Sequence, residues 1–551
     1  MRPARRRISV LALGLALAAP GVHAGPPAAA VASGHPLATE AGHATLDQGG
    51  NAFDAAVAIA AVLAVVDPAN SGLGGGGFWL LRRADGFETV VDGRERAPLA
   101  ARREMYLDAD GEVIARASLD GALAAAIPGT PAALGHITAQ YGRLDLSRNL
   151  APAVRLARAG FSLSERYRTM IDRRLPALLA SPAAAQVFLD DGEVPPSGYV
   201  IRQPQLAATL ERLAAHGHAG FYDGAVAARL VEGVRAAGGI WTGEDLASYR
   251  VVEREPLRGE YRGLRITAPP PPSSGGLALL QMLGILGGQD LERLERVQRD
   301  RLAIEAMRRA YRDRARYLGD PDFVPVDVAQ LLSPGYIKRL RRELNAPAAT
   351  RPRKEAAGVH TTHFSVIDRA GNVAAVTLTL NTHFGSGFMP DGTGVLLNNE
   401  MDDFVLKPGA PNAYGLTGSE ANAISPGKRP LSSMTPAILE NDRRLVALGT
   451  PGGGRIISMM LLATLEVAHG RGNVRDWLAR PRFHHQYLPD EVQYEAAAFG
   501  AEEEQRLARM GYKLRRLEAD YGNMQAVVWH KKPDRLEAAS DPRGEGAAVV
   551  R

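Results

Sequence analysis

Apolar and polar residues alternate along one segment in the second half of the chain. The segment THFSVIDRAGNVAAVTLTLN, residues 362–381, keeps this period of two on both sides of DRAGN. Such alternation predicts two strands, and the Asp, Gly and Asn between them suit a tight turn. With residues 369–371 as a three-residue loop, Thr361 lies opposite Thr379. We therefore predict a β-hairpin in this register.

The two faces of this hairpin differ in polarity. The apolar face carries Phe364, Val366, Ala374, Val376, Leu378 and Leu380, and the polar face carries Thr361, His363, Ser365, Thr377, Thr379 and Asn381. The polar face of an antiparallel pair often points to water. A loop one residue longer would also exchange the two faces. A functional site is the alternative, and the hairpin alone does not decide between these interpretations.

Helical patterns dominate the chain before the hairpin. Residues 51–66 form an almost unbroken apolar run, which predicts a helix buried on most sides. Charged residues at helical spacing predict scaffold helices with exposed faces at 205–216, 225–237 and 294–318. Short strands and helices alternate again after the hairpin, and no repeat divides the chain. We expect one large α/β unit.

Two loops allow more than one interpretation. Gly72, Gly74 and Gly77 formally match G-x-G-x-x-G, but they follow a helix and precede a strand. A dinucleotide-binding fold needs the reverse order, which argues against a nucleotide site. Ser273 and Ser274 stand just before a predicted helix, where they either cap it or position a ligand. Capping is the favoured interpretation.

Residues 1–24 have the pattern of a secretory signal peptide. An arginine-rich start, an apolar run and the motif Val22-His23-Ala24 predict cleavage after Ala24. Four arginines lie in this segment, so a formal charge of +5 becomes +1 for the remaining chain. The chain has no cysteine, no later apolar run long enough for a bilayer and no basic stripe for nucleic acid. We expect a periplasmic or secreted protein without disulfides, nucleic-acid partners or a membrane span in the mature chain.

Eight motifs in order resemble those of one known family. The motifs are DGRERAP, PPPPSSGG, THFSV, TLNTHFG, LLNNEMDDF, KRPLSSM, TPGGGRI and PRFHHQ. Together they resemble the gamma-glutamyltransferases, also called glutathione hydrolases, over essentially the whole mature chain. This family belongs to the N-terminal-nucleophile hydrolases, so the resemblance implies an α/β fold with an αββα four-layer sandwich.

The resemblance also implies that the chain cuts itself between His360 and Thr361. The products are a large chain, residues 25–360, and a small chain, residues 361–551. Residues 345–358, just before the cut, are rich in Pro, Ala and charge without periodicity, as expected of a mobile or cut segment. Cleavage gives Thr361 a free amine, whose ordinary pKa of about 7.7–8.0 allows it to take the proton of the same residue's hydroxyl.

Further roles follow from the resemblance, residue by residue. Thr361 is implied as the nucleophile, and Thr379 as the residue whose hydroxyl orients it. The backbone N–H groups of Gly452 and Gly453 match the family's oxyanion hole, and the loss of one such donor typically costs about 10²–10³ in rate. Tyr414, in the loop 408–418, matches a lid over the pocket.

The implied substrate group carries both an α-carboxylate and an α-ammonium. By resemblance, the carboxylate is held by Arg94, Ser432 and Ser433, and the ammonium by Asn381, Glu400 and Asp403. From the residues alone, a surface charge for Arg94, a helix cap for Asp403 and a turn at the two serines remain alternatives. Glu400 stands where many bacterial members have glutamine, and His383 is unusual in its motif.

The sequence therefore predicts an enzyme that cleaves glutathione and related gamma-glutamyl amides through an ester on Thr361. Water or an acceptor amino acid or dipeptide then takes the gamma-glutamyl group. We expect no cofactor and no metal, since adjacent His484 and His485 point to opposite faces of a strand without further ligands. A glutaryl or cephalosporin acylase of the same fold is one alternative, and a non-catalytic periplasmic amino-acid-binding protein is the other.

Overall fold

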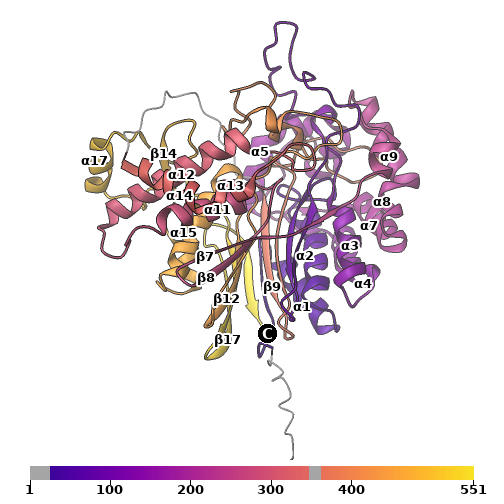
Figure 1. Cartoon of the computed structure of the whole chain (residues 1–551). Helices are drawn as coiled ribbons and strands as arrows, with labels where there is room; N and C mark the ends of the chain where they lie inside the picture. Colours follow the sequence, from indigo (N-terminus) through magenta and orange to yellow (C-terminus); the bar gives the residue numbers. More distant parts are fainter. Residues whose placement is uncertain (1–24, 346–360) are drawn as a thin grey trace, which may run out of the picture.

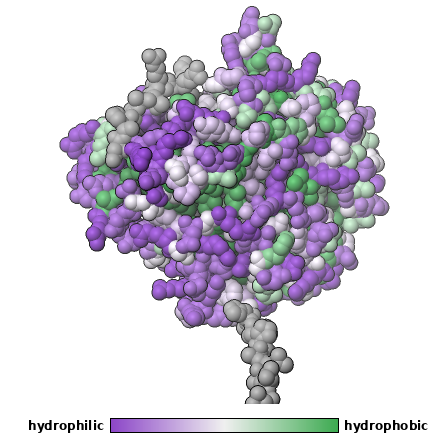
Figure 2. All heavy atoms as spheres, in the orientation of Figure 1, coloured by the Kyte–Doolittle hydropathy of each residue, from purple (hydrophilic) through white to green (hydrophobic). Residues whose placement is uncertain are grey.

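The computed structural model describes residues 25–345 and 361–551. The predicted signal peptide, His360 and almost all of the predicted cut segment lie outside these residues. Two antiparallel sheets pack face to face, and helices cover the outer side of each (Figure 1). This is the αββα arrangement that the resemblance implied. Figure 2 shows that hydrophilic residues cover most of one surface, with hydrophobic residues scattered among them.

The first sheet has seven strands and contains the predicted hairpin. In spatial order, its strands are β18 (Ala547–Val550), β1 (Ala30–Ser33), β9 (Thr362–Ile367), β10 (Val373–Thr379), β2 (Gly76–Arg82), β3 (Glu88–Gly93) and β6 (Val252–Arg254). Central strands β9 and β10 are buried on both faces, although one face carries the polar side chains of the hairpin.

The second sheet has six strands. In spatial order they are β17 (Asp534–Ser540), β16 (Gln525–Lys531), β12 (Arg444–Gly449), β11 (Ala437–Glu440), β8 (Leu264–Ala268) and β7 (Leu257–Tyr261). Two small sheets lie apart from these, one formed by β13 (Phe483–His484), β14 (Val492–Tyr494) and β15 (Leu514–Arg516), and the other by β4 (Phe161–Ser162) and β5 (Val200–Ile201).

Helices from the first half of the chain pack on the outer face of the first sheet and share one apolar core with it. They are α1 (Pro36–Asp47), α2 (Ala52–Val66), α3 (Thr130–Tyr141), α4 (Leu146–Ala159), α5 (Glu165–Leu179), α6 (Pro182–Phe188), α7 (Pro204–His216), α8 (Ala219–Tyr222), α9 (Gly224–Ala236) and α10 (Gly243–Ala247). The predicted buried helix is α2, whose residues are all buried and whose start is capped by Asn51.

The remaining helices contribute to a second apolar core, which also contains residues from both sheets. They are α11 (Gly275–Leu286), α12 (Arg296–Tyr317), α13 (Val328–Leu332), α14 (Pro334–Arg342), α15 (Ile456–Ala468), α16 (Val474–Ala479) and α17 (Ala501–Arg509). The predicted scaffold helices correspond to α7, α9 and α12, with ends within two residues of prediction. Within the described residues, no helix is long and apolar enough to cross a membrane.

The hairpin register is confirmed. Ile367 pairs with Val373 and Thr362 with Leu378, which continues to Thr361 opposite Thr379. The interpretation that the polar face points to water is wrong, because this face is buried between the two sheets. There, His363 forms hydrogen bonds with the hydroxyls of Thr377 at 2.8 Å and Ser365 at 3.0 Å. Burial lowers the pKa of His363 to about 3, so the ring is neutral at ordinary pH.

Candidate active site

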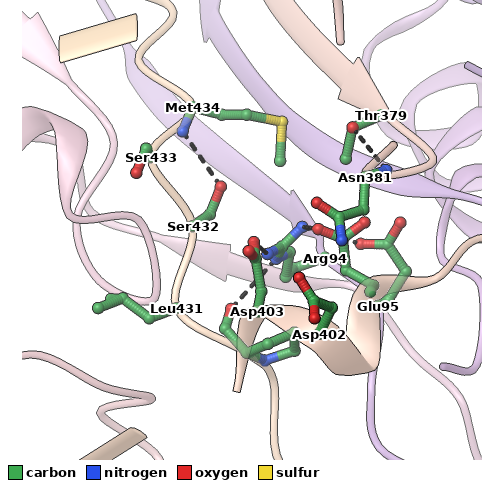
Figure 3. Close-up of polar contacts among 12 residues, drawn as sticks. Arg94, Glu95, Thr379, Asn381, Asp402, Asp403, Leu431, Ser432, Ser433 and Met434 are labelled. Atoms are coloured by element: carbon green, nitrogen blue, oxygen red, sulfur yellow. Dashed lines mark hydrogen bonds and ion pairs between the residues drawn. The ribbon is translucent and has the colours of Figure 1, made fainter. Parts of the chain in front are cut away.

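Thr361 lies at the end of the hairpin where β9 begins and β10 ends. Its side chain is buried, and its Oγ1 lies 3.4 Å from Oγ1 of Thr379. The backbone N–H of Asn381 donates to Thr379 Oγ1 at 2.8 Å (Figure 3). Since the Thr379 hydroxyl accepts this bond, its own proton is available to an acceptor such as Thr361 Oγ1. The geometry holds the two hydroxyls side by side.

Arg94 forms the centre of a buried charged cluster (Figure 3). It lines the same pocket as the two threonines. It directly follows β3, and its guanidinium pairs with Glu95 at 3.3 Å, with Asp403 at 2.6 Å and with Glu400. Its Nε also donates to the carbonyl of Pro430 at 3.1 Å. The surface interpretation of Arg94 is therefore wrong.

Glu400 and Asp403 come from the same turn of 3-10 helix, η3 (Glu400–Asp403). Burial raises the pKa of Glu400 well above its ordinary value, against the opposing effect of Arg94. Burial likewise raises the pKa of Glu95 to about 7. Glu400 Oε2 is buried and has no hydrogen-bond partner among the described residues. A buried acceptor without a donor is costly, so this side of the pocket favours a cationic or hydrogen-bond-donating ligand.

Ser432 and Ser433 form the opposite side of the pocket. Ser432 Oγ accepts a hydrogen bond from the N–H of Met434 at 3.1 Å, and Ser433 Oγ accepts one from Arg314 Nη2 at 3.3 Å. Arg314 is a site residue that the sequence analysis missed, because one buried arginine on a highly charged helix has no distinguishing sequence signal.

The loop that carries these serines is tied to the start of α11. Ser274 Oγ donates to the carbonyl of Ser432, and Ser273 Oγ donates to that of Met434, both at 2.6 Å. The favoured prediction that this serine pair caps α11 is wrong for Ser274, whose side chain forms no capping bond. Ser273 Oγ does accept from the N–H of Gly275 at 3.1 Å. The pair chiefly positions the neighbouring loop.

Gly452 and Gly453 follow β12, with φ angles of 151° and 53°. Both values lie where side chains are disfavoured, which explains the glycines. Gly453 lines the pocket with Thr361, and a Cβ on Gly453 would lie 2.4 Å from the ring of Tyr414. Gly452, the other predicted oxyanion-hole residue, directly precedes Gly453 in the chain and is not among the residues that line this pocket.

Tyr414, the predicted lid residue, lines the pocket, and hydrogen bonds join its segment to other residues of the site. The Tyr414 hydroxyl donates to the carbonyl of Asn381, and Asn412 Nδ2 donates to Asp403 Oδ1 at 2.9 Å. The pocket that remains has a volume of about 20 Å³. On this measure a cavity of about 10–15 Å³ holds one water molecule, so the pocket as it stands has room for one or two.

A much larger cavity lies on the other side of Thr361. Its volume is about 1100 Å³, and its walls include residues of α5 and of the segment 515–523. Among the described residues, Thr361 alone lines both spaces. His383 lines the larger cavity, and its Nδ1 pairs with Asn70 Oδ1 at 3.1 Å. Thr361 therefore separates a small charged pocket from a wide cavity.

The structure brings together nearly every predicted site residue. The pocket is lined by Arg94, Thr361, Thr379, Asn381, Glu400, Asp403, Tyr414, Ser432, Ser433 and Gly453, together with Leu416, Met434 and Ile456. His484 and His485 lie outside this pocket, where Nε2 of the first pairs with Gln486 at 2.8 Å and Nε2 of the second with Asp490 at 3.0 Å.

Comparisons with known proteins place the chain in one family. The family model for gamma-glutamyltranspeptidase matches residues 38–551. The chain is 42% identical over 528 residues to a glutathione hydrolase proenzyme of Escherichia coli strain K12, covering 93% of this chain and 90% of that protein.

Two solved structures are similar as well. A cephalosporin acylase from Bacillus halodurans has a TM-score of 0.84 and 27% identity, with 98% of this chain and 99% of that chain covered. Gamma-glutamyltranspeptidase of Helicobacter pylori has a TM-score of 0.56 and 38% identity, with 63% of this chain and 95% of that chain covered.

Proposed function

The chain belongs to the gamma-glutamyltranspeptidase family of enzymes, and on that premise we propose that it hydrolyses gamma-glutamyl amides such as glutathione and transfers the gamma-glutamyl group to amino acids or dipeptides. One observation carries this proposal. Thr361 lies between a small pocket, which is lined by acidic and basic residues, and a cavity wide enough for the rest of the substrate.

The small pocket is matched to an α-amino acid head group. Asp403 and the unpartnered Glu400 Oε2 offer acceptors to an ammonium group. Ser432 and Ser433 offer hydroxyl donors to a carboxylate. Each hydrogen bond to a charged group contributes about 1.5–3 kcal/mol. With both charges held, the γ-carbonyl extends toward Thr361, and the amide nitrogen with its substituent extends into the wider cavity.

The proposed reaction has two steps. The Thr361 hydroxyl loses its proton to the free amine of the same residue, and Oγ1 attacks the γ-carbonyl carbon. The N–H groups of Gly452 and Gly453 stabilise the oxyanion, the carbon–nitrogen bond breaks, and the amine gives its proton to the leaving nitrogen. Water or an acceptor amine then attacks the ester, and its proton returns through the same amine to Oγ1.

This mechanism requires the bond between His360 and Thr361 to be cut. We therefore include in the proposal self-cleavage into a large chain of residues 25–360 and a small chain of residues 361–551, both contributing to one αββα unit. Arg94 from the first and Thr361 from the second already line one pocket. Export to the periplasm or medium under direction of residues 1–24 completes the proposal.

An acylase for glutaryl or cephalosporin side chains is the second candidate, and the similarity to the cephalosporin acylase favours it. A glutaryl group has a carboxylate but no ammonium. It would leave Glu400 Oε2 buried without a donor and Asp403 without an added cation. The gamma-glutamyl group is therefore the better match.

Two measurements test the proposed function. The purified protein should run as two bands on a denaturing gel, with Thr361 as the first residue of the smaller chain, and it should cleave gamma-glutamyl-p-nitroanilide faster than glutaryl-p-nitroanilide. The variant Thr361→Ala should remain one inactive chain. An active uncut chain would exclude the mechanism, and a preference for the glutaryl substrate would favour the acylase.

A further inference from the structure

Arg314 is a buried cation at the edge of the small pocket. It lies in the last turn of α12 and is 6% exposed. Its Nε donates to Ser274 Oγ at 3.0 Å, and its Nη2 donates to Ser433 Oγ at 3.3 Å. Ser274 in turn donates to the carbonyl of Ser432 at 2.6 Å. One guanidinium thus contacts both serines of the pocket, directly or through one hydroxyl.

Arg314 and Arg94 have different charged groups around them. Arg94 forms ion pairs with three carboxylates, whereas Arg314 forms no ion pair with any carboxylate in the described parts of the chain. Burial lowers the pKa of Arg314, and the carboxylate of Asp403 is the largest opposing influence. A buried arginine without a paired carboxylate is costly unless an anion compensates for it.

The hydrogen bonds on this side also fix the polarity of the serines. Ser433 Oγ accepts from Arg314, and Ser432 Oγ accepts from the N–H of Met434. A hydroxyl that accepts such a bond directs its own proton elsewhere, and both serines line the pocket. This side of the pocket therefore combines two hydroxyl donors with a positive charge behind them, as the recognition of a carboxylate requires.

We propose that Arg314 is a positioning residue for the substrate's α-carboxylate, acting through Ser433 and Ser432. This inference rests on the proposed function and adds a second buried arginine to the side of the pocket that receives the carboxylate. Arg94 is already paired with the side chains of Glu95, Glu400 and Asp403. Arg314 has no such pair among the described residues, so a bound carboxylate would compensate its charge across the two serines.

The test compares two competitive inhibitors that differ only in the α-carboxylate, L-glutamate and 4-aminobutyrate. The wild type and the variants Arg314→Gln and Arg314→Lys are assayed with gamma-glutamyl-p-nitroanilide. For Arg314→Gln, we expect the inhibition constant of glutamate to rise roughly 10- to 100-fold, while that of 4-aminobutyrate changes by no more than about twofold. Arg314→Lys keeps the charge and should recover part of the glutamate affinity.

Arg312→Gln is the matched control. Arg312 lies on the same helix, is more exposed and pairs with Glu343 at 2.9 Å, away from the serines. The variant Arg312→Gln should leave both inhibition constants near those of the wild type. If Arg314→Gln fails to fold or to process itself, the same comparison is made with Arg314→Lys and Ser433→Ala, which should weaken glutamate more than 4-aminobutyrate.

The outcomes separate the two proposals. A wild type that does not cleave the gamma-glutamyl substrate would overturn the proposed function. A wild type that cleaves it, with Arg314 variants that weaken both inhibitors equally or neither, would overturn only the assignment of Arg314. Equal weakening would mean that Arg314 supports the fold of the pocket without recognising the carboxylate.

Discussion

Thr361 Oγ1 and Thr379 Oγ1 lie 3.4 Å apart across the β9–β10 pair, on a face that is buried between two sheets. In the proposed mechanism, Thr379 orients the hydroxyl of the nucleophile across this distance. Thr379→Ala should lower kcat by about 10²-fold with a smaller effect on KM, since a misplaced reacting atom loses that much rate. The measurement is steady-state hydrolysis of gamma-glutamyl-p-nitroanilide by processed enzyme.

The control for this prediction is Thr377→Ala, two residues earlier on the same face. Thr377 contacts His363 and is not part of the pocket lining. The variant Thr377→Ala should destabilise the protein without a comparable loss of kcat. Equal losses of kcat in both variants would mean that the polar face acts as a structural unit.

Asp403→Asn tests the recognition of the ammonium group. Asp403 pairs with Arg94 and lines the pocket, and removal of its charge should raise KM for the gamma-glutamyl substrate roughly 10- to 100-fold. The glutaryl analogue lacks the ammonium and should lose much less. The ratio of kcat/KM for the two substrates measures the effect, and an unchanged ratio would contradict the assignment of Asp403.

The sequence predicted the part of this site that depends on local pattern. Alternation and the turn residues around Asp368 set the register of the hairpin, because strand pairing across a short loop follows from the loop length. That register placed Thr361 beside Thr379 before any contact was known. The motif resemblance supplied the other pocket residues, which come from segments far apart in the chain.

Features that depend on tertiary packing were not accessible in this way. Whether the polar face of the hairpin is buried depends on the second sheet, which approaches so closely that a Cβ on Gly449 would lie 2.4 Å from the ring of His363. The roles of Ser274 and Arg314 likewise depend on how α11 and α12 meet the loop at Ser432. A charged helix pattern does not mark which of its arginines are buried, here Arg309 and Arg314.

The pH dependence of stability should contain a contribution from Asp402. Its carboxylate accepts hydrogen bonds from Ser118 Oγ and from the N–H of Ala413, both at 2.8 Å. Burial raises the pKa of Asp402 from 3.8 to about 7. The folded protein therefore holds this proton more tightly than the unfolded chain, and the contribution to stability is greatest below pH 3.8 and is lost as the pH rises to about 7.

Asp402→Asn removes that titration. The melting temperature of the wild type minus that of the variant should fall between pH 4 and pH 7 and level off above about pH 7. The measurement is a series of thermal scans at one scan rate and constant ionic strength. A difference that rises with pH would show that the folded state favours the charged form of Asp402.

Tyr414→Phe tests the cover of the small pocket. The variant loses the hydrogen bond from the Tyr414 hydroxyl to the carbonyl of Asn381 but keeps the ring that packs on Gly453. We expect freer opening of the segment and hence a larger share of hydrolysis relative to transfer, since water then competes better with the acceptor. Product ratios at fixed acceptor concentration measure this share.

Tyr222→Phe is the control for a lost buried hydroxyl. Tyr222 donates to the carbonyl of Pro128 at 2.8 Å within the core of the helices on the first sheet. The variant Tyr222→Phe should lower stability and leave the ratio of hydrolysis to transfer products unchanged. A ratio that shifts equally in both variants would indicate a general loosening of the protein and no specific role for Tyr414.

Gly453→Ala and Gly470→Ala compare two glycines with similar backbone conformations but different surroundings. Their φ angles are 53° and 65°, so an alanine at either position carries a similar backbone strain. A Cβ on Gly453 would lie 2.4 Å from the ring of Tyr414, whereas a Cβ on Gly470 meets nothing within 4 Å. Gly453→Ala must therefore displace either the tyrosine or the backbone N–H assigned to the oxyanion. Its kcat should fall by about 10²-fold or more, while Gly470→Ala keeps kcat near the wild-type value at a modest cost in stability. If kcat of Gly453→Ala stays within a few-fold of the wild type, the N–H of this residue does not stabilise the transition state, because no alanine fits there without moving the groups that surround it.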